Sequence, residues 1–329
     1  MKKIIITTLI LLTSLVLYLH DYNNKPISES RLMMDTVITV KAWPPNAQSA
    51  INEAFKVFHE IEEALSFHIE SSELSALNTN FQATRTIHLD NITDLSLKYY
   101  KITEGYFDPS FAIVNKLYGF YGNIPSQLPD KELIKDTINE FAGLTKVLSF
   151  DKDYAHLKHG AKIDFGGIAG GYAINLAARA MVNAGCHTFL IDDAGDIKVM
   201  GTKPDKSEWT IAVLNPIEKS FLATAKLPSA MCISTSGNYE RFVEINGIKY
   251  GHIMNPLTGF PAEDFVSVSV IAETPEEADI LSTALFAMPK ESAYKIAEEL
   301  SLAALFLTAD KKVVLSKKGN DFFLLNTTK

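Results

Sequence analysis

The sequence Ile163-Asp-Phe-Gly-Gly-Ile-Ala-Gly-Gly-Tyr172 places four glycines and a carboxylate directly before a helical pattern of apolar residues at 173–184. A glycine-rich turn leaves backbone N–H groups free to bind a ligand, and the first turn of a helix favours phosphate. The spacing matches neither the dinucleotide fingerprint nor the phosphate-binding loop that ends in Gly-Lys-Ser/Thr. These residues alone leave two interpretations open, a phosphate site and a simple tight turn.

Length and composition are those of an ordinary globular chain. The 329 residues, of which 47% are hydrophobic and 21% charged, suffice for one large domain or two smaller lobes. The formal net charge of −8 argues against a nucleic-acid surface, and the sequence has no dense run of Lys and Arg. We therefore expect proteins or small molecules as partners, and no nucleic acid.

The first twenty residues have the form of an export signal. Lys2 and Lys3 precede an apolar run at 4–19, which is slightly short for a spanning helix. No cysteine follows the run, so a lipoprotein anchor is excluded. We expect an exported protein on the periplasmic side of the inner membrane. The predicted parts are a signal peptide or N-terminal membrane anchor at 1–20, with the anchor slightly favoured, a linker at 21–30 and one domain at 31–329.

The exported part contains only two cysteines, Cys186 and Cys232. They lie far apart in sequence, among apolar or small residues, and form no Cys-x-x-Cys motif. We predict two buried free thiols. A single disulfide between them is the alternative.

Periodicity predicts an α+β fold with a mixed or antiparallel sheet and peripheral helices. Thr274 is the expected N-cap of one helix, and Gly185 the expected C-terminal stop of another. Strands are predicted at 36–42, 147–150, 155–158, 161–165, 188–191, 197–201, 209–213, 221–226, 231–235, 241–245 and 265–272, with short strands within 303–325. Helices are predicted at 47–67, 95–103, 173–184, 275–287 and 291–299.

Two clusters of polar residues suggest chemistry. Asp279 and Thr283 share one face of a predicted helix with Ser282 beside them, so three oxygens can converge on a hard cation. The alternative is an Asp–Thr pair on a solvated face. His252 lies between a strand end and two turns, a favourable place for proton transfer, although a lone His is more often structural.

Two further segments are less specific. The polar turn at 234–241 offers hydroxyl groups and a glycine that suit phosphate oxygens, or it is simply a turn between strands. In Tyr106-Phe-Asp-Pro109 an aromatic pair precedes a carboxylate at a chain reversal, and core packing is the default interpretation.

Taken in sequence order, these clusters resemble the ApbE family of FAD:protein FMN transferases over nearly the whole chain after the N-terminal segment. Each motif alone is weak, but eight in order make a chance similarity improbable. The matching motifs are Met34-x-Thr36, residues 66–78, Gly105-Tyr-Phe-Asp-Pro109, Asp164-Phe-Gly-Gly-Ile-Ala169, Ala194-Gly-Asp-Ile197, Ile233-Ser-Thr-Ser-Gly237, His252-Ile253 with Pro256-x-Thr-Gly259, and Ala278-Asp279 with Ser282-Thr283.

The resemblance implies a T-fold-like ApbE architecture that binds FAD and Mg²⁺. It implies cleavage of the FAD pyrophosphate, attachment of FMN through a phosphoester to a Thr hydroxyl of an acceptor protein, and release of AMP. The acceptor, with a Thr or Ser flavinylation site, would be a subunit of a membrane redox complex. Hydrolysis of FAD to FMN and AMP is the related alternative. Both reactions need a cation, backbone donors and a base.

The resemblance also assigns residues to roles. Asp279 and Thr283 would be the side-chain ligands of the metal, with Ser282 adjacent and the backbone carbonyl of Gly167 as a further ligand. His252 would transfer the proton. The positions that correspond to FAD contacts are Met34, His68, Tyr106, Phe107, Asp108, Asp164, Gly170 and Ile253.

Several positions depart from the usual family pattern. Gly170 stands where a lysine is usual, and a glycine cannot supply that charge to the phosphates. Arg241 or Lys162 would then replace the lost cation in an active transferase. The alternatives are a flavin- or metal-binding protein with little or no transfer activity, and an exported structural or interaction protein that retains only the fold. The other departures are Asp35, Asn175, Ala194 and His68.

Overall fold

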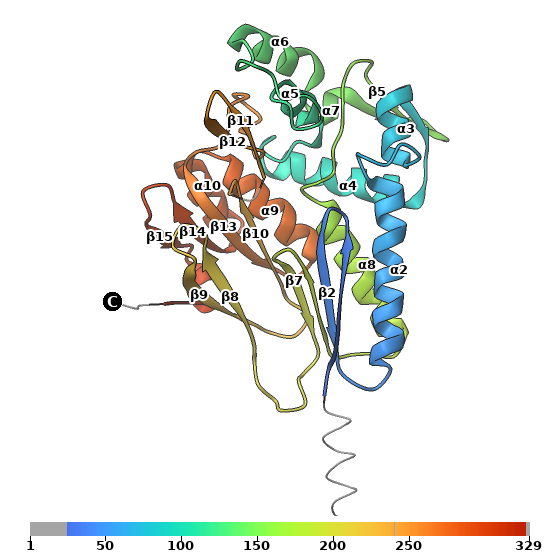
Figure 1. The fold of residues 1–329 in the computed structure, drawn as a ribbon, viewed down its shortest axis with the longest axis vertical. Helices are drawn as coiled ribbons and strands as arrows, with labels where there is room; N and C mark the ends of the chain where they lie inside the picture. Colours follow the sequence, from blue (N-terminus) through green and yellow to red (C-terminus); the bar gives the residue numbers. More distant parts are fainter. Residues whose placement is uncertain (1–24, 240, 327–329) are drawn as a thin grey trace, which may run out of the picture.

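The computed structural model describes residues 25–239 and 241–326 and centres on an eight-stranded sheet (Figure 1). Its strands pair antiparallel throughout, in the order β1-β2-β6-β7-β10-β13-β14-β15. The strands are β1 (Ile27–Met33), β2 (Thr36–Ala42), β6 (Phe189–Asp193), β7 (Asp196–Met200), β10 (Cys232–Gly237), β13 (Phe265–Ala272), β14 (Ala303–Thr308) and β15 (Val313–Leu315).

Helices α2 (Ala47–Leu65), α8 (Ala169–Asn183) and α9 (Pro275–Ala287) pack together and against one face of this sheet. Helix α2 packs there because its apolar residues recur at helical spacing and form one continuous apolar stripe that faces the core. Its main members are at most 1% exposed, namely Ile51, Phe55, Phe58 and Ile61.

A small sheet covers the opposite face. It consists of β8 (Trp209–Asn215), β9 (Ser220–Leu227) and β16 (Phe323–Leu325), in the order β16-β9-β8. Alternation along β13 serves both layers, since Val268 and Val270 belong to the helix-side core and Ile271 to the core under the small sheet.

Most of the remaining elements form a largely helical lobe above one end of the main sheet (Figure 1). A small sheet in the order β3-β5-β4 and the hairpin of β11 and β12 accompany its helices. The elements of the lobe are α3 (Glu73–Asn80), β3 (Gln82–Thr84), α4 (Ile87–Ile102), η1 (Pro109–Phe111), α5 (Ala112–Leu117), α6 (Lys131–Phe141), α7 (Leu144–Val147), β4 (Leu148–Phe150), β5 (Tyr154–Leu157), β11 (Phe242–Ile245) and β12 (Ile248–Gly251). Outside the lobe, α10 (Lys290–Glu299) packs beside α9, and η2 (Lys318–Asp321) contacts β14, β15 and β16.

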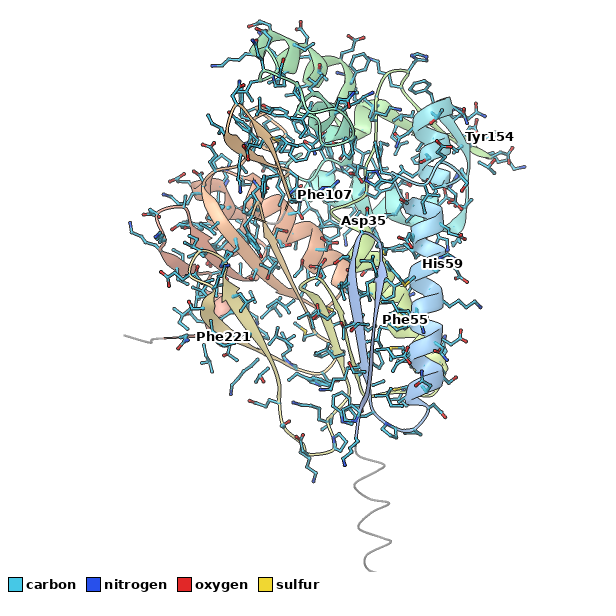
Figure 2. The ribbon with its side chains drawn as sticks, viewed as in Figure 1. Asp35, Phe55, His59, Phe107, Tyr154 and Phe221 are labelled. Atoms are coloured by element: carbon cyan, nitrogen blue, oxygen red, sulfur yellow. The ribbon has the colours of Figure 1, made fainter. Side chains whose placement is uncertain are left out.

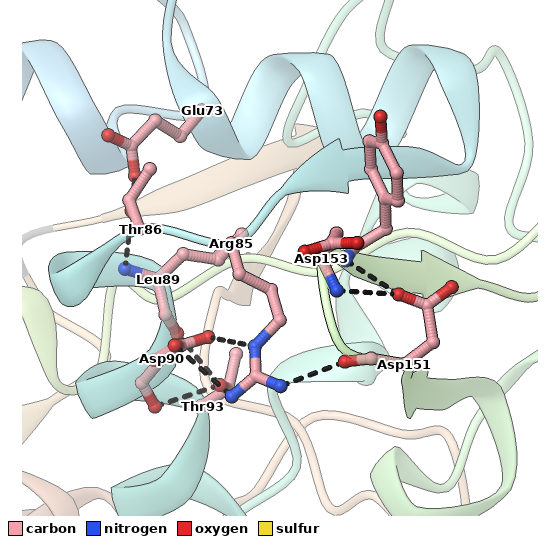
Figure 3. Close-up of polar contacts among 9 residues, drawn as sticks. Glu73, Arg85, Thr86, Leu89, Asp90, Thr93, Asp151 and Asp153 are labelled. Carbon is pink, nitrogen blue, oxygen red and sulfur yellow. Dashed lines mark hydrogen bonds and ion pairs between the residues drawn. The ribbon is translucent and has the colours of Figure 1, made fainter.

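Polar contacts fix the start of α4 against the β4–β5 turn (Figure 3). The Thr86 hydroxyl accepts a hydrogen bond from the Leu89 N–H at 3.2 Å, which caps the helix. Arg85 donates to both carboxylate oxygens of Asp90 at 3.0 and 3.2 Å, and to the Asp151 carbonyl at 2.8 Å. These contacts extend α4 back to Ile87, well before the helix predicted from position 95.

The predicted α+β class with antiparallel sheet and peripheral helices is confirmed. The strand at 265–272 and the helix at 275–287, with Thr274 as its cap, lie where the sequence predicts them. Ala184 is the C-cap of α8, and Gly185 follows it at a φ of +83°, consistent with the predicted stop. Cys186 and Cys232 are free and buried, as predicted.

Two local predictions are wrong. Residues 161–165 form no strand, because the Asn78 side chain takes both backbone groups of Ile163, each at 2.8 Å. Strand β1 begins at Ile27, inside the predicted linker, because its polar sequence pairs with β2 along the edge of the sheet. Residues 1–20, predicted as signal or anchor, lie outside the described residues. Among the described residues, no helix has the length and apolar character needed to cross a membrane.

The turn between β6 and β7 consists of Ala194 and Gly195, both at positive φ, +49° and +104°. Such two-residue hairpin turns favour glycine, because an L side chain in this region is strained.

Replacement of Ala194 by glycine should therefore stabilise the protein by about 0.5–1 kcal/mol. Relief of the backbone strain stabilises the folded state, and the greater conformational entropy of glycine in the unfolded chain offsets part of that gain. Urea unfolding measures the change. Ala184→Gly is the control, because Ala184 has a φ of −73° and gains nothing from glycine. An Ala194→Gly protein no more stable than the parent would contradict the strain.

Candidate active site

A cavity of about 440 Å³ lies where the β1–β2 hairpin, the glycine-rich turn, β10 and α9 meet. Two of its lining side chains, Asp35 and Phe107, lie close together between the helical lobe and the main sheet (Figure 2). Of the site residues predicted from the sequence, all but Ser282 line this cavity: Met34, His68, Tyr106, Phe107, Asp108, Asp164, Gly167, Gly170, His252, Ile253, Asp279 and Thr283.

Gly171 brings helix α9 against the first turn of α8. A Cβ atom at this position would lie 2.6 Å from the Pro275 carbonyl oxygen and 2.8 Å from Glu276 backbone atoms, so only glycine permits the approach. Across this contact the Gly171 N–H donates to the Asp279 carboxylate at 3.1 Å. The predicted helix-borne carboxylate therefore meets the glycine turn.

The carbonyl of Gly167 lies on the turn just before α8. Gly171 is in the first turn of this helix, whose N–H groups have no partner within the helix, and its N–H bonds to Asp279 instead. Within the described part of the chain, the Gly167 carbonyl accepts no backbone hydrogen bond. The side chain of Thr283 lies beside Gly167, since its Oγ1 would be 3.5 Å from a Cβ atom at that position.

A partly buried network of hydroxyl groups supports Thr283. The Thr283 Oγ1 lies 3.1 Å from the Ser236 Oγ, which lies 2.8 Å from the Ser282 Oγ. Ser282 also donates to the Asp279 carbonyl at 3.0 Å and is fully buried. The structure thus places Ser282 beneath the cavity wall, where it orients the helix that carries the other oxygens.

Three carboxylates gather around Gly170. A Cβ atom there would lie 3.1 Å from Asp193, 3.5 Å from Asp196 and 3.8 Å from Asp279, measured to the nearest carboxylate oxygen. Burial, with Asp196 and Asp192 nearby, raises the pKa of Asp193 to about 7. Burial and the charge of Asp196 also raise the pKa of Asp279 well above its usual value.

The oxygens at this site fit a hard divalent cation that also binds a ligand. Among the described residues, no group of three or more His, Cys, Asp or Glu side chains is arranged to hold a metal ion alone. Mg²⁺ in proteins is commonly held by one or two carboxylates together with ligand phosphates and water. Asp279, the Thr283 hydroxyl and the free Gly167 carbonyl provide such a partial set.

Aromatic rings form the opposite wall. The rings of Phe67 and Tyr121 pack with centroids 4.3 Å apart and an interplanar angle of 32°, and His68 lies 6.4 Å from Tyr121. The Tyr121 hydroxyl donates to Asp164 at 2.6 Å. This wall suits a flat aromatic ligand.

The Asp108 carboxylate forms hydrogen bonds within the protein. It accepts hydrogen bonds from the N–H and the hydroxyl of Ser110 and from the Gly143 N–H, at 2.6–3.0 Å. Burial nevertheless raises its pKa. Asp108 therefore fixes the 106–111 chain reversal at the cavity edge.

His252 is held as a neutral imidazole. Its Nδ1 lies 3.1 Å from the Arg241 carbonyl, an oxygen that can only accept, so Nδ1 carries the proton. Burial, together with the charge of Arg241, lowers the pKa of His252 to about 4. The Nε2 lone pair is then available as a proton acceptor at neutral pH.

Of the two cations considered as replacements for the missing lysine, the structure places one at the cavity. Arg241 lines it. Lys162 does not, because its Nζ donates to the Asn78 carbonyl at 2.7 Å and lies over the Phe81 ring. Lys162 is therefore ruled out as the replacement.

The cavity of this antiparallel α+β fold is lined by hard oxygens and backbone groups of a glycine turn and by aromatic rings. Such a lining suits a phosphorylated aromatic ligand. The chain belongs to the ApbE family, whose model matches residues 34–306.

Curated relatives and solved structures agree with this assignment. The chain is 28% identical to an FAD:protein FMN transferase of Haemophilus influenzae, with all of both chains covered. It is 27% identical to that of Treponema pallidum, over 87% of this chain and 85% of the relative. The ApbE protein of Thermotoga maritima superimposes with a TM-score of 0.84 at 26% identity, covering 91% of this chain and 99% of that one. The apo flavinyl transferase ApbE of Pseudomonas stutzeri gives 0.80 at 25%, covering 92% and 99%.

Sequence reasoning missed several cavity residues. Asp193 and Tyr121 lie outside the matching motifs, and Phe67 lies within the matching stretch 66–78 without a predicted role. The repeated acids Asp192-Asp193 before a glycine turn were the one available signal for the acidic group.

The raised pKa of Asp193 predicts a pH-dependent cost to folding. Its carboxyl ionises near pH 4 in the unfolded chain but near pH 7 when folded, so its contribution to stability falls as pH rises through this window. Asp193→Asn should therefore gain a few kcal/mol over the parent at pH 8, and far less at pH 4.

Urea unfolding in a chelating buffer at both pH values measures this gain. Asp310→Asn is the control, and its effect on stability at pH 8 should have the opposite sign, a loss. The reason is that a hydrogen bond from Lys312 lowers the pKa of Asp310 to about 2. Equal gains for Asp193→Asn at pH 4 and pH 8 would rule out the buried ionisation.

Proposed function

We propose that this protein is an FAD:protein FMN transferase that depends on Mg²⁺. It cleaves the pyrophosphate of FAD, joins FMN to a Thr or Ser hydroxyl of an acceptor protein and releases AMP. The observation that carries the proposal is the meeting of Asp279, Thr283 and the free Gly167 carbonyl beside an aromatic wall, in a chain of the ApbE family.

FAD has two chemically different parts to place. The wall of Phe67, His68 and Tyr121 suits the flat flavin ring, while the first turn of α8 favours the pyrophosphate. Asp279, Thr283 and Gly167 would hold Mg²⁺, which when bound neutralises charge on the phosphates. Arg241 at the cavity edge supplies a positive charge that Gly170 does not.

The transfer step needs a base. The acceptor hydroxyl oxygen forms a bond to the phosphorus of the FMN half, and the bond from that phosphorus to the oxygen of the AMP phosphate breaks. The hydroxyl proton passes to Nε2 of His252, whose Nδ1 proton is held by the Arg241 carbonyl. Water in place of the hydroxyl would give FMN and AMP as free products.

The setting of the reaction follows from the N-terminal sequence and the family. We propose an exported enzyme on the periplasmic side of the inner membrane, held there by its N-terminal segment or released after its cleavage. Its acceptor would be a subunit of a membrane redox complex.

Purified protein incubated with FAD, Mg²⁺ and a Thr-bearing acceptor domain should produce a fluorescent flavin band on the acceptor in a denaturing gel. Asp279→Ala should abolish this labelling, because it removes a metal ligand and the Gly171 hydrogen bond together. Asp205→Ala, on an exposed loop, is the control and should label normally. Free FMN and AMP without labelled acceptor would indicate hydrolysis. The absence of both labelled acceptor and free FMN would refute both reactions.

His252→Gln should lower the transfer rate by about 10²–10⁴-fold, the usual contribution of a positioned base. Because the pKa of His252 is lowered to about 4, the parent should lose the activity that depends on this group only below about pH 5. The rate–pH profile of the two proteins tests both statements. An acid limb near pH 6.5 that disappears in His252→Gln would contradict a base held neutral by burial.

A further inference from the structure

The Tyr121 hydroxyl is the side-chain donor to Asp164, at 2.6 Å from its Oδ2. Burial, followed by the charge of Asp164 itself, raises the pKa of Tyr121 well above its usual value, so the phenol keeps its proton and donates. A hydrogen bond to an ionised carboxylate is among the stronger contacts in a protein. Forty-three positions separate the two residues, so only the fold joins them.

Asp164 closes the turn that leads to the free carbonyl. Its Oδ1 accepts the Gly166 N–H at 2.9 Å, and its own N–H donates to the Pro109 carbonyl at 3.0 Å. Gly167 is the next residue. The orientation of the Asp164 carboxylate therefore fixes the backbone that presents the Gly167 oxygen.

Tyr121 is itself fixed. Its ring packs on Phe67 with centroids 4.3 Å apart, and the half-buried side chain bonds to Asp164. Asn115 and Arg241 lie near enough to influence this pair, since both lower the pKa of Tyr121. Without the phenol, the Oδ2 of Asp164 would be free to turn toward the Arg241 guanidinium.

We propose that Tyr121 is a positioning residue for the transfer reaction. Through Asp164 it holds the Gly166–Gly167 turn in the form that binds the metal and the pyrophosphate, and it couples the flavin wall to the phosphate side of the cavity. This role rests on the proposed function, and it assigns Tyr121 no contact with the reacting atoms.

The test uses the full chain with Tyr121→Phe, which keeps the ring on Phe67 and removes only the hydroxyl. Its matched control is Tyr118→Phe, a buried tyrosine of the same segment that donates to the Gly259 carbonyl at 3.0 Å and does not line the cavity. Three measurements are made: steady-state kinetics with FAD, which give kcat and KM; FAD affinity of metal-free protein, by flavin fluorescence; and Mn²⁺ affinity in the presence of FAD, by EPR.

Tyr121→Phe should lower kcat about tenfold or more and weaken Mn²⁺ binding about tenfold, the loss of one hydrogen bond to a charged group. FAD affinity without metal should change less than about threefold, because the aromatic wall remains. Tyr118→Phe should leave all three unchanged. Parent-like Mn²⁺ affinity in Tyr121→Phe would overturn the proposal, and so would an unfolded variant, which would assign Tyr121 to stability alone.

A double-mutant cycle separates this role from others. If Tyr121 acts through Asp164, then Tyr121→Phe should have little further effect on Mn²⁺ affinity in an Asp164→Asn background. Additive effects would contradict the coupling. A parent protein that binds FAD and Mn²⁺ but makes no product would refute the proposed function, while the Mn²⁺ cycle would still decide the role of Tyr121.

Discussion

The hydrogen bond from the Gly171 N–H to the Asp279 carboxylate, at 3.1 Å, determines how the cavity is assembled. It depends on Gly171, because any side chain there would collide with the start of α9. It gives a partner to an N–H of the first turn of α8, which has none within the helix. One contact thus joins two distant helices and caps one of them, beside the Gly167 carbonyl, which accepts no backbone hydrogen bond within the described residues.

The acidic surroundings of Gly170 give the site its electrostatic character. Asp193, Asp196 and Asp279 approach one another in a buried place, and the raised pKa values of Asp193 and Asp279 express the cost of their ionisation. The proposed cation would offset this cost, which would link metal binding to stability. Two departures from the family pattern, Gly170 and Ala194, lie at this acidic group.

Sequence predicted what local patterns encode. The α9 helix with its Thr274 cap, strand β13, and the shared face of Asp279 and Thr283 all follow from periodicity within one element. The α+β class followed from the same patterns, and the family resemblance supplied the other predicted site residues. Contacts between residues far apart in sequence could not be predicted, because they leave no local signal. Examples are the Asn78 side chain, which takes the place of a strand partner for Ile163, and the Tyr121 hydroxyl, which bonds to Asp164. The buried position of Ser282 likewise depends on strand β10, which packs against α9.

The central claim is that one cation binds where α8 and α9 meet. Crystals of the protein grown with FAD and Mn²⁺ in place of Mg²⁺, measured at the manganese absorption edge, test it most directly. The account predicts one strong anomalous peak in contact with the Asp279 carboxylate, the Thr283 hydroxyl and the Gly167 carbonyl. A peak elsewhere in the cavity, or none at this position with FAD bound, would contradict it.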